Sequence, residues 1–506
     1  MRNTFRLPFA VAGWALVGAC VWLGSDAGAD DWPMWGRTPS RNMVGLEKDG
    51  PTDWDFESGR GLRWRADLGS QSYGNPVVAG GLVIVGTNNE AKRDPRHAAD
   101  GGVLAIFRES DGKFLWQQYS AKLKSGRVND WPYQGICSTA LVEGALLWYC
   151  TNRCEVICLD LSPLREGKPE PREVWRLDMT AQLGVFPHNM TSCSVGAFED
   201  LIYIITGNGA DDTHRNIPVP KAPSIVCLNK NTGKVVWTDN SPGENVLHGQ
   251  WSSPTVVTVN GRPQAICPLG DAWVYSFEPR TGKILWRFDA NRKDSVYPAI
   301  RNELIATPVV IDNRMYIATG QDPEHGEGPG TLWCVDITRE GDISAELDER
   351  PRPKPGDPPA RVPGAIKPNP NSGVLWVYER FDVDGDGKFS SKERMHRSIS
   401  TVAVHEGLVF AGDFSGFVHC LDALTGKHYW TYDMEAAMWG SPMVADGKLY
   451  VGDEDGDVAI LAADRVLRPI ATHNAGSPIY STPVLANGTL YVMCRDKLFA
   501  IGPGRK

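Results

Sequence analysis

Residues 400–430 read STVAVHEGLVFAGDFSGFVHCLDALTGKHYW, and the same pattern recurs along the chain. Residues 307–320, 441–456 and 482–495 repeat its opening half, and residues 229–237 and 278–286 repeat its closing half. Each copy holds four short apolar runs separated by turns rich in Gly, Asn and Asp, which predicts four strands. Because so short a unit buries its faces only against its neighbours, the repeat predicts a radial array of small sheets.

Every copy opens with a small polar residue, usually followed by proline. Eight such anchors occur: Asn75-Pro76, Ser138-Thr139, Ser194, Ser253-Pro254, Thr307-Pro308, Ser400-Thr401, Ser441-Pro442 and Thr482-Pro483. The eighth copy ends before its fourth strand, and residues 61–68 (GLRWRADL), which carry Trp64, match the missing strand. The sequence therefore predicts an all-β fold: an eight-bladed β-propeller of four-stranded antiparallel blades, closed by an N-terminal strand that removes an exposed edge.

The fourth strand of most copies ends in a tryptophan that we expect to pack one blade against the next. These residues are Trp116, Trp175, Trp237, Trp286, Trp376 and Trp430. A small residue recurs in the third strand, where Cys158, Cys227, Cys334 and Cys420 are expected to be buried packing residues. Two other cysteine pairs, Cys150 with Cys154 and Cys137 with Cys193, are candidates for disulfides if their geometry permits.

The N-terminus has the pattern of a signal peptide over residues 1–29. Arg2 and Arg6 precede an apolar stretch over residues 7–23, and Ala27-Gly28-Ala29 offers a cleavage site. Secretion to the periplasm or beyond is therefore expected, and the propeller should occupy residues 30–506. A membrane anchor is the alternative, as is lipidation at Cys20. The net charge of −9 without a basic patch does not favour nucleic acid as a partner.

An insertion over residues 337–370 interrupts the repeat pattern, and its proline-rich part should be exposed and irregular. Residues 382–393 (DVDGDGKFSSKE) then match a calcium-binding EF-hand loop. The carboxylates alternate, Gly387 permits the sharp turn, and the closing glutamate can supply two oxygens to a hard cation. The expected ligand positions are Asp382, Asp384, Asp386, Lys388, Ser390 and Glu393. Because the loop is single, we expect a structural site; an acidic surface turn is the alternative.

The copies resemble the pyrroloquinoline-quinone (PQQ) repeat family. The resemblance rests on the Thr/Asp-Gly-Lys-x-x-Trp ends of residues 111–116, 232–237, 281–286 and 425–430, and on the Ser-Pro openings. The family includes eight-bladed quinoprotein alcohol dehydrogenases and the propeller lipoprotein of the outer-membrane barrel-assembly machinery. Residues 31–41, 184–190, 248–254 and 320–328 also look like secreted planctomycete propellers. Such a resemblance implies the fold strongly and the activity weakly, because one architecture hosts many functions.

Side chains just before each anchor should converge on the central channel. Polar and aromatic residues at such a mouth suit a small polar or planar ligand. The candidates are His188, Asn189, His248, Gln250, Trp251, Asn302, Glu303, His396, Arg397 and Trp439, together with Tyr73, Tyr133, Gln134 and Tyr480.

Asp322, Glu324 and His325 lie on a loop between second and third strands, which we expect on the opposite face. His188, His248 and His325 could together bind a metal such as zinc. They belong to different blades, however, without the local spacing of a metal motif. A hydrogen-bonding loop role or direct ligand contact are the alternatives for each.

Two functions follow. The first is a binding or scaffold module that holds a protein or saccharide of the cell envelope, or a small polar ligand in the channel. The second is a PQQ-dependent dehydrogenase of alcohols or sugars, in which calcium would polarise the quinone. The dehydrogenase pattern is incomplete: the sequence has no adjacent cysteine pair and no Cys-x-x-Cys-His haem motif. Glu303 and Asn189 are possible calcium ligands there, and no catalytic residue is identified.

Overall fold

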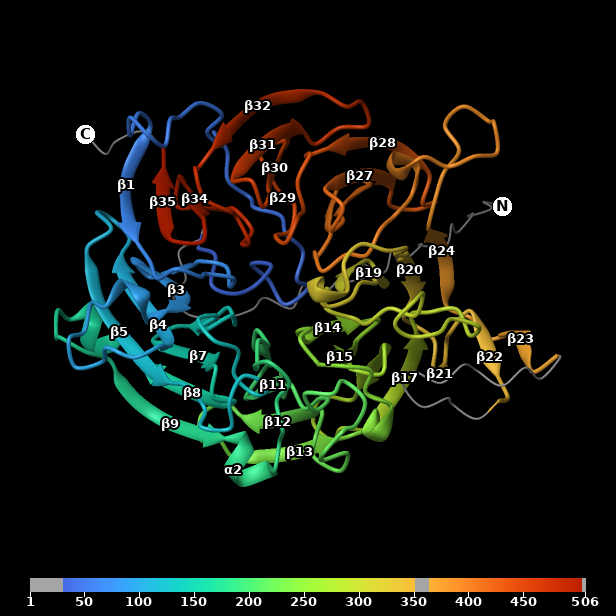
Figure 1. The fold of residues 1–506 in the computed structure, drawn as a ribbon, viewed down its shortest axis with the longest axis horizontal. Helices are drawn as coiled ribbons and strands as arrows, with labels where there is room; N and C mark the ends of the chain where they lie inside the picture. The colour runs from blue at the N-terminus through green and yellow to red at the C-terminus, as the bar shows by residue number, and fades with distance from the viewer. Residues whose placement is uncertain (1–30, 351–363, 503–506) are drawn as a thin grey trace, which may run out of the picture.

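Eight four-stranded antiparallel sheets surround a central axis in the computed structural model, which describes residues 31–350 and 364–502 (Figure 1). Blades 1 to 4 comprise β2 (Val77–Ala79), β3 (Leu82–Asn88), β4 (Gly101–Arg108) and β5 (Phe114–Ala121); β6 (Leu141–Glu143), β7 (Leu146–Cys150), β8 (Glu155–Asp160) and β9 (Arg172–Asp178); β10 (Gly196–Phe198), β11 (Leu201–Ile205), β12 (Ile225–Asn229) and β13 (Val235–Asp239); β14 (Thr255–Val259), β15 (Arg262–Pro268), β16 (Trp273–Phe277) and β17 (Ile284–Asp289).

Blades 5 to 8 complete the ring. They comprise β18 (Val309–Ile311), β19 (Arg314–Ala318), β20 (Leu332–Asp336) and β24 (Val374–Tyr378); β25 (Ala403–His405), β26 (Leu408–Gly412), β27 (Phe417–Asp422) and β28 (His428–Asp433); β29 (Met443–Ala445), β30 (Lys448–Gly452), β31 (Asp457–Ala462) and β32 (Pro469–Asn474); β33 (Val484–Ala486), β34 (Thr489–Met493), β35 (Lys497–Ile501) and β1 (Leu62–Asp67). The predicted eight-bladed propeller is confirmed.

Helices are short and lie in connections. They are α1 (Ser162–Arg165), α2 (Met179–Leu183) and the 3-10 turns η1 (Asn89–Ala91), η2 (Gly243–Asn245), η3 (Pro323–His325) and η4 (Ser391–Glu393). Among the described residues, none of these is long and apolar enough to cross a membrane. The signal segment and Cys20 lie outside the described residues.

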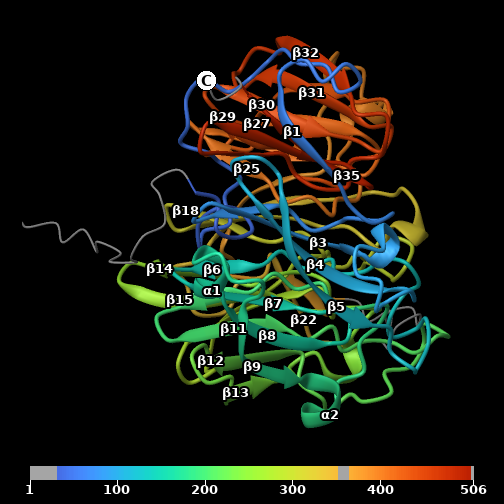
Figure 2. The same cartoon turned by 90° about the vertical axis from the view of Figure 1, so that its left-hand side faces the viewer.

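The last blade is closed by the N-terminal strand, as the sequence predicts. β1 pairs antiparallel with β35, and Trp64 lies opposite Ala500. Figure 2 shows the blue β1 beside the red C-terminal strands. This pairing joins chain segments more than four hundred residues apart, completes the eighth blade and closes the ring.

The sequence anchors form a ring of hydrogen bonds around the axis. The backbone N–H of one anchor donates to the side-chain oxygen of the anchor in the next blade. The bonds run Asn75 to Thr139 (2.9 Å), Thr139 to Ser194 (3.1 Å), Ser194 to Ser253 (2.9 Å), Thr307 to Thr401 (3.3 Å), Thr401 to Ser441 (2.9 Å), Ser441 to Thr482 (2.9 Å) and Thr482 back to Asn75 (2.9 Å). Between blades 4 and 5, the Ser252 hydroxyl donates instead to Ala306 O (2.8 Å). This ring explains why a small side chain with an acceptor oxygen recurs at the anchors.

The recurring tryptophans join neighbouring blades, and the turn glycines make room for them. The indole N–H donates to a backbone carbonyl of the next blade in five pairs: Trp64 to Glu109, Trp175 to Lys230, Trp237 to Pro279, Trp376 to Ala423 and Trp430 to Asp464. A Cβ on Gly233 would lie 2.6 Å from the Trp175 ring, so only glycine fits at that turn. Trp286 departs from the pattern, because it donates to Gln264 within its own blade.

The recurring cysteines are small residues placed opposite these tryptophans. Cys158 pairs with Trp175, Cys227 with Trp237, Cys334 with Trp376 and Cys420 with Trp430 in the strand register. All four are fully buried, as predicted. The structure leaves both candidate disulfide pairs unbridged: every cysteine of the described part is free.

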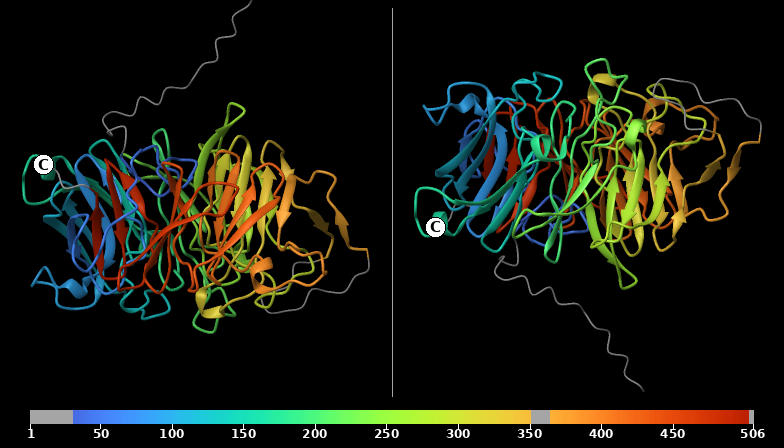
Figure 3. Two further views of the ribbon diagram at one scale, coloured as in Figure 1. Left: turned by 90° about the horizontal axis from the view of Figure 1, so that it is seen from above. Right: turned by 90° about the horizontal axis from the view of Figure 1, so that it is seen from below.

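Residues 31–51, here called the lacing segment, run across one face of the propeller and contact every blade (Figure 3). Backbone or side-chain hydrogen bonds reach all eight blades, through Trp32 to Val78, Pro33 to Val142, Arg41 to Val195 and to Pro254, Ser40 to Val310, Asn42 to Val404, Met43 to Val444 and Glu47 to Gly488. Arg41 is fully buried and donates to the backbone carbonyl of Trp35 and to three others at this end of the channel. These are Ser194 O, Val195 O and Pro254 O, the last of which accepts two hydrogen bonds. This segment therefore closes one end of the channel.

The described parts of the insertion extend the rim of the ring. β21 (Gly341–Asp342) adds to blade 4 beside β17, and β22 (Glu346–Asp348) pairs with β23 (Ile366–Pro368). Figure 3 shows this hairpin projecting outward. Blade 5 then resumes with β24, which carries Trp376 as the sequence predicts.

We predict that Trp430→Ala lowers the free energy of unfolding by about 3–5 kcal/mol, because it empties a buried site between blades 6 and 7. Trp430→Phe keeps most of the apolar contact and loses the bond to Asp464 O, so its loss should be smaller. Chemical denaturation of both variants measures the difference. A loss below about 1 kcal/mol for Trp430→Ala would contradict the role of Trp430 as an anchor.

Candidate functional site

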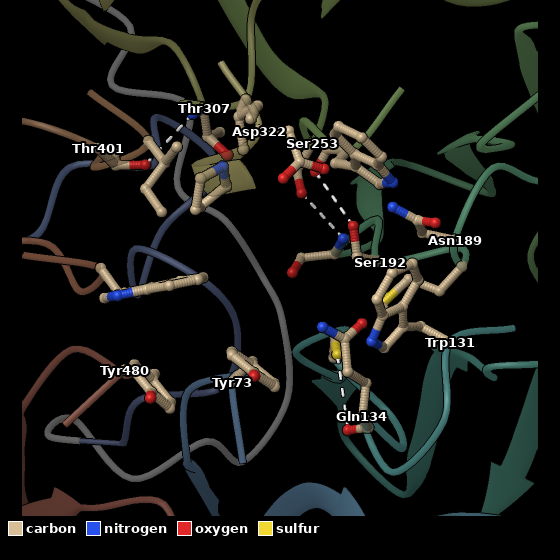
Figure 4. Close-up of a pocket in the computed structure, with 18 of the residues that line it drawn as sticks. Tyr73, Trp131, Gln134, Asn189, Ser192, Ser253, Thr307, Asp322, Thr401 and Tyr480 are labelled. Atoms are coloured by element: carbon tan, nitrogen blue, oxygen red, sulfur yellow. Dashed lines mark hydrogen bonds between the residues drawn. The ribbon is translucent and has the colours of Figure 1, made fainter. Parts of the chain in front are cut away.

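A cavity of about 290 Å³ lies in the central channel, and all eight blades contribute to its wall (Figure 4). Its lining residues are Trp35, Tyr73, Trp131, Gln134, Cys137, Asn189, Met190, Ser192, Ser194, Trp251, Ser253, Ile305, Thr307, Asp322, Pro323, Glu324, Ile399, Thr401, Trp439 and Tyr480. Trp35 belongs to the segment that laces the opposite face. The cavity is therefore a pocket that opens away from that segment.

Aromatic rings gather on one side of the pocket. The rings of Tyr73 and Tyr480 are stacked, with centroids 5.0 Å apart and planes inclined by 11°. The Trp439 ring lies 4.9 Å from that of Tyr480, and its indole N–H donates to a carboxylate oxygen of Glu454. Burial raises the pKa of Tyr73, so its hydroxyl stays protonated at neutral pH. This side offers flat apolar surfaces with polar edges.

Hydroxyl groups and two carboxyl groups line other parts of the pocket. Ser194, Ser253 and Thr401 belong to the anchor ring, where their oxygens accept backbone hydrogen bonds. Asp322 and Glu324 also line the pocket, so the expectation that their loop lies on the opposite face was wrong. The loop between β19 and β20 folds back over the channel, because the isolated bridge Glu303–Gly320 ties its start to the segment before blade 5.

Six of the residues predicted at the channel mouth do line this pocket: Tyr73, Gln134, Asn189, Trp251, Trp439 and Tyr480. Tyr133 instead points to solvent. Gln250, Asn302 and Arg397 are buried, and each is engaged by the backbone. Gln250 donates to Asn208 O and accepts from Gly270 N. Arg397 donates to carbonyls of two loops, including Pro298 O and His325 O. These three residues therefore hold the loops in place.

His396 is hydrogen-bonded to a buried carboxylate and does not line the pocket. Its Nδ1 and the Nε2 of His419 each lie 3.0 Å from Asp413 Oδ2. Burial alone would raise the pKa of Asp413, but the hydrogen bonds from the two histidines outweigh it and hold this pKa at about 2. Asp453 occupies the same place in blade 7 without a histidine partner, and burial raises its pKa to about 6.

Four histidines lie together beside the pocket, between blades 3, 4 and 5. The centroids of His188 and His248 are 4.3 Å apart, those of His214 and His248 are 4.4 Å apart, and those of His248 and His325 are 5.2 Å apart. His188 and His248 are 1% and 0% exposed. Burial lowers the pKa of His188 to about 3 and that of His248 to about 4, so both rings are neutral at pH 7. Trp251 separates them from the pocket and donates to His188 O.

Glu303 closes the other side of this histidine cluster. One carboxylate oxygen accepts a hydrogen bond from the Tyr297 hydroxyl (2.9 Å) and lies 3.5 Å from His248 Nδ1. The side chain is 2% exposed, and burial raises the pKa of Glu303 to about 7. One ligand atom each from His188, His214 and His248 lie within 4.8 Å of one another, as do those of His248, Glu303 and His325. Both triads could hold a metal ion.

Sequence reasoning missed His214, Trp35 and Trp131. A signal for His214 was present: residues 207–214 (GNGADDTH) and residues 320–325 (GQDPEH) both follow the second strand of their blades and end in histidine. Aligning the copies through these loops would have paired His214 with His325. Trp35 carries no such signal, because it reaches the channel from outside the repeats.

The acidic loop over residues 382–393 adopts a closed turn on the outer strand of blade 5. Asp382 accepts from Gly385 N and Gly387 N, and Glu393 accepts from Val383 N and Ser390 N. One oxygen each from Asp382, Asp384 and Glu393 lie within 4.8 Å of one another. Its last three residues form the single 3-10 turn η4 in place of the usual helix.

The contrast between the two blade aspartates generates a pH prediction. Since the folded pKa of Asp453 is raised from 3.8 to about 6, its ionisation destabilises the fold as pH rises through that range. Asp453→Asn should therefore gain stability over wild type by up to about 3 kcal/mol between pH 4 and pH 8. Urea denaturation at several pH values measures this, with Asp212→Asn at an exposed position as control. A difference between wild type and Asp453→Asn that is independent of pH would contradict the burial of an ionising carboxyl.

Comparison with known proteins finds similarity to proteins built from the same kind of repeat. The sequence profile described as outer membrane protein assembly factor BamB matches residues 40–130 and 376–503. A 1-butanol dehydrogenase (cytochrome c) of Thauera butanivorans is 30% identical over 108 residues, which are 20% of this chain and only 15% of that protein. The match to this curated relative thus covers much less than its whole length.

Two solved structures share the fold across most of the chain. The quinohemoprotein alcohol dehydrogenase of Comamonas testosteroni has a TM-score of 0.61 at 13% identity, covering 94% of this chain and 81% of that one. BamB of Moraxella catarrhalis has a TM-score of 0.53 at 15% identity, covering 86% of this chain and 98% of that one. At such identities these likenesses show the fold alone. The repeat motif, the ring of blades and the profile match, which covers less than half of the chain, together support the PQQ-repeat β-propeller family.

Proposed function

We propose that this propeller is a binding module of the cell envelope whose channel pocket holds a small, uncharged polar ligand, with a mono- or disaccharide as the best-fitting class. The observation that carries the proposal is the composition of the pocket: stacked aromatic rings on one side and a ring of hydroxyls deeper in. A sugar presents an apolar face to aromatic rings and hydroxyls to polar groups, which matches both surfaces. The volume of about 290 Å³ limits the ligand to a small one.

The pocket does not fit pyrroloquinoline quinone. That cofactor is a tricarboxylate, and sites for such anions rely on Arg, Lys or clustered N–H donors. None of the described residues that line the pocket is Lys or Arg, and Asp322 and Glu324 add negative charge. Asn189 lines the pocket while Glu303 lies behind it, so the pair does not converge on a single site within the pocket. The alternative of a quinone-dependent dehydrogenase is therefore weaker.

A location in the envelope is supported by two observations. The N-terminal residues have the pattern of a signal peptide, and the matching profile describes an outer membrane assembly factor. Protein partners would use the rims of the blades, which is the surface that the lacing segment and the channel leave free. Binding is the shared element of these roles, and the pocket is where it is most directly tested.

Titration of the purified protein with neutral sugars tests the pocket. Cellobiose and N-acetylglucosamine should change the tryptophan fluorescence, and Trp439→Ala should weaken binding by about fivefold, because an aromatic contact of about 1 kcal/mol is lost. Tyr133→Ala is the matched control, since Tyr133 points to solvent and should leave affinity unchanged. An absence of sugar binding, combined with a quinone absorbance after incubation with PQQ and calcium, would favour the dehydrogenase instead.

We also propose that residues 382–393 hold a structural calcium ion. The support is the proximity of three carboxylates at alternate and closing positions of the loop, with Asp386, Ser390 and the Lys388 carbonyl as the remaining oxygen donors. Lys392 forms an ion pair with Asp433 of β28, which ties the loop to blade 6. An ion here would stiffen the junction between blades 5 and 6.

Calcium should raise the thermal unfolding temperature of chelator-treated protein. At a hundredfold excess over the dissociation constant, one bound ion stabilises by about 2.7 kcal/mol. Glu393→Gln removes the closing bidentate ligand and should abolish most of that rise. The exposed Glu435→Gln is the control. A calcium response that Glu393→Gln leaves intact would place the ion elsewhere.

A further inference from the structure

The histidine cluster beside the pocket contains buried nitrogen atoms without hydrogen-bond partners. Nε2 of His188 and both ring nitrogens of His248 are enclosed and make no hydrogen bond with the described residues, although Nδ1 of His248 faces Glu303 at 3.5 Å. A buried polar atom without a partner costs free energy, so proteins seldom leave three of them side by side. The cluster therefore calls for a species that accepts lone pairs from neutral imidazoles, and a metal cation is such a species.

The remote nitrogens of these rings are oriented as in histidine metal ligands. Nδ1 of His188 lies 2.7 Å from Ala210 O, which makes it the protonated nitrogen and directs the Nε2 lone pair into the cluster. Nδ1 of His248 lies 3.5 Å from Glu303, whose carboxylate can accept its proton in the same way. A carbonyl and a carboxylate behind two imidazoles are the supports that fix the tautomer of a ligand and raise its basicity.

The backbone brings the rings together through close contacts. Gly209 lies so near His188 and His248 that a Cβ there would be 2.6 Å from both His188 Cβ and His248 O. Ala210 N donates to His248 O (2.8 Å), which joins the His214 loop to the segment before blade 4. His214 has φ 57° and is partly exposed, so it stands at the outer edge of the cluster.

We infer that His188, His214 and His248 bind one divalent transition-metal ion, with Zn²⁺ as the ion to test first, and that Glu303 positions His248. Three imidazole ligands match the preference of Zn²⁺ and leave its fourth coordination position to water or another ligand. The carboxylate loop over residues 382–393 has only oxygen donors, so it suits calcium and not this ion. The histidine site is thus distinct from both the calcium loop and the pocket, and does not depend on the ligand proposed there.

Equilibrium dialysis of the full, metal-stripped chain with Zn²⁺ tests the inference, in excess calcium to occupy the acidic loop. Wild type should bind one ion per chain. His214→Gln should weaken binding by about a hundredfold or more, since a direct ligand matters at least as much as a supporting group. This variant is the most informative, because His214 is partly exposed and its replacement disturbs packing least. Wild type that binds no Zn²⁺, or His214→Gln with unchanged affinity, would overturn the inference.

Three further variants distinguish the ligand set. Glu303→Gln should weaken Zn²⁺ binding by about 10–100-fold and shift the absorption bands of the Co²⁺-loaded protein, which a merely structural role would not do. His405→Gln, far from the cluster on β25, should change neither. His325→Gln should keep most of the affinity; a loss equal to that of His214→Gln would overturn the assigned ligands in favour of His248, Glu303 and His325. Circular dichroism confirms that each variant is folded.

Discussion

The ring of anchor hydrogen bonds is the constraint on which the rest of the structure depends. Seven of the eight innermost strands begin where a backbone N–H meets the side-chain oxygen of the next blade. A hydroxyl is small enough to let eight strands converge, and its oxygen satisfies a donor that water cannot reach. The spacing of the blades, the width of the channel and the direction of the loops above it all follow from this ring. The tryptophans and their glycines then fix the outer parts of the blades.

The sequence predicts the fold well because each of its signals acts locally and is repeated. Ser-Pro and Thr-Pro openings, alternating strands and Gly-Lys turns recur in register, and Trp64 could be assigned to the last blade from its context alone. The pairing of Cys158 with Trp175 shows why a small residue was needed in the third strand. The interruption at blade 5 also left its signal intact, since β24 resumes with Trp376.

The candidate site was predicted less completely, for two physical reasons. First, the repeat shows which segments approach the axis but not which way each side chain points, so Gln250 and Arg397 were grouped with Trp439 although they bond to the backbone. Second, the loop between β19 and β20 changes direction through non-repeating contacts, which brought Asp322 and His325 to the face where they were not expected. Trp35 was missed because its approach depends on a segment that belongs to no blade.

The lacing segment and β1 affect the order in which parts of the molecule can fold during synthesis. Residues 31–51 and β1 are among the first parts of the folded chain to be synthesised, yet their partners include the very last strands. Pairing segments that are so far apart in the sequence costs more loop-closure entropy than forming a single blade from consecutive strands. The individual sheets can therefore form as they emerge, while the final joining of the circle waits until β35 has been synthesised. Until then, β1 lacks its strand partner and could pair with the β35 of a second nascent chain.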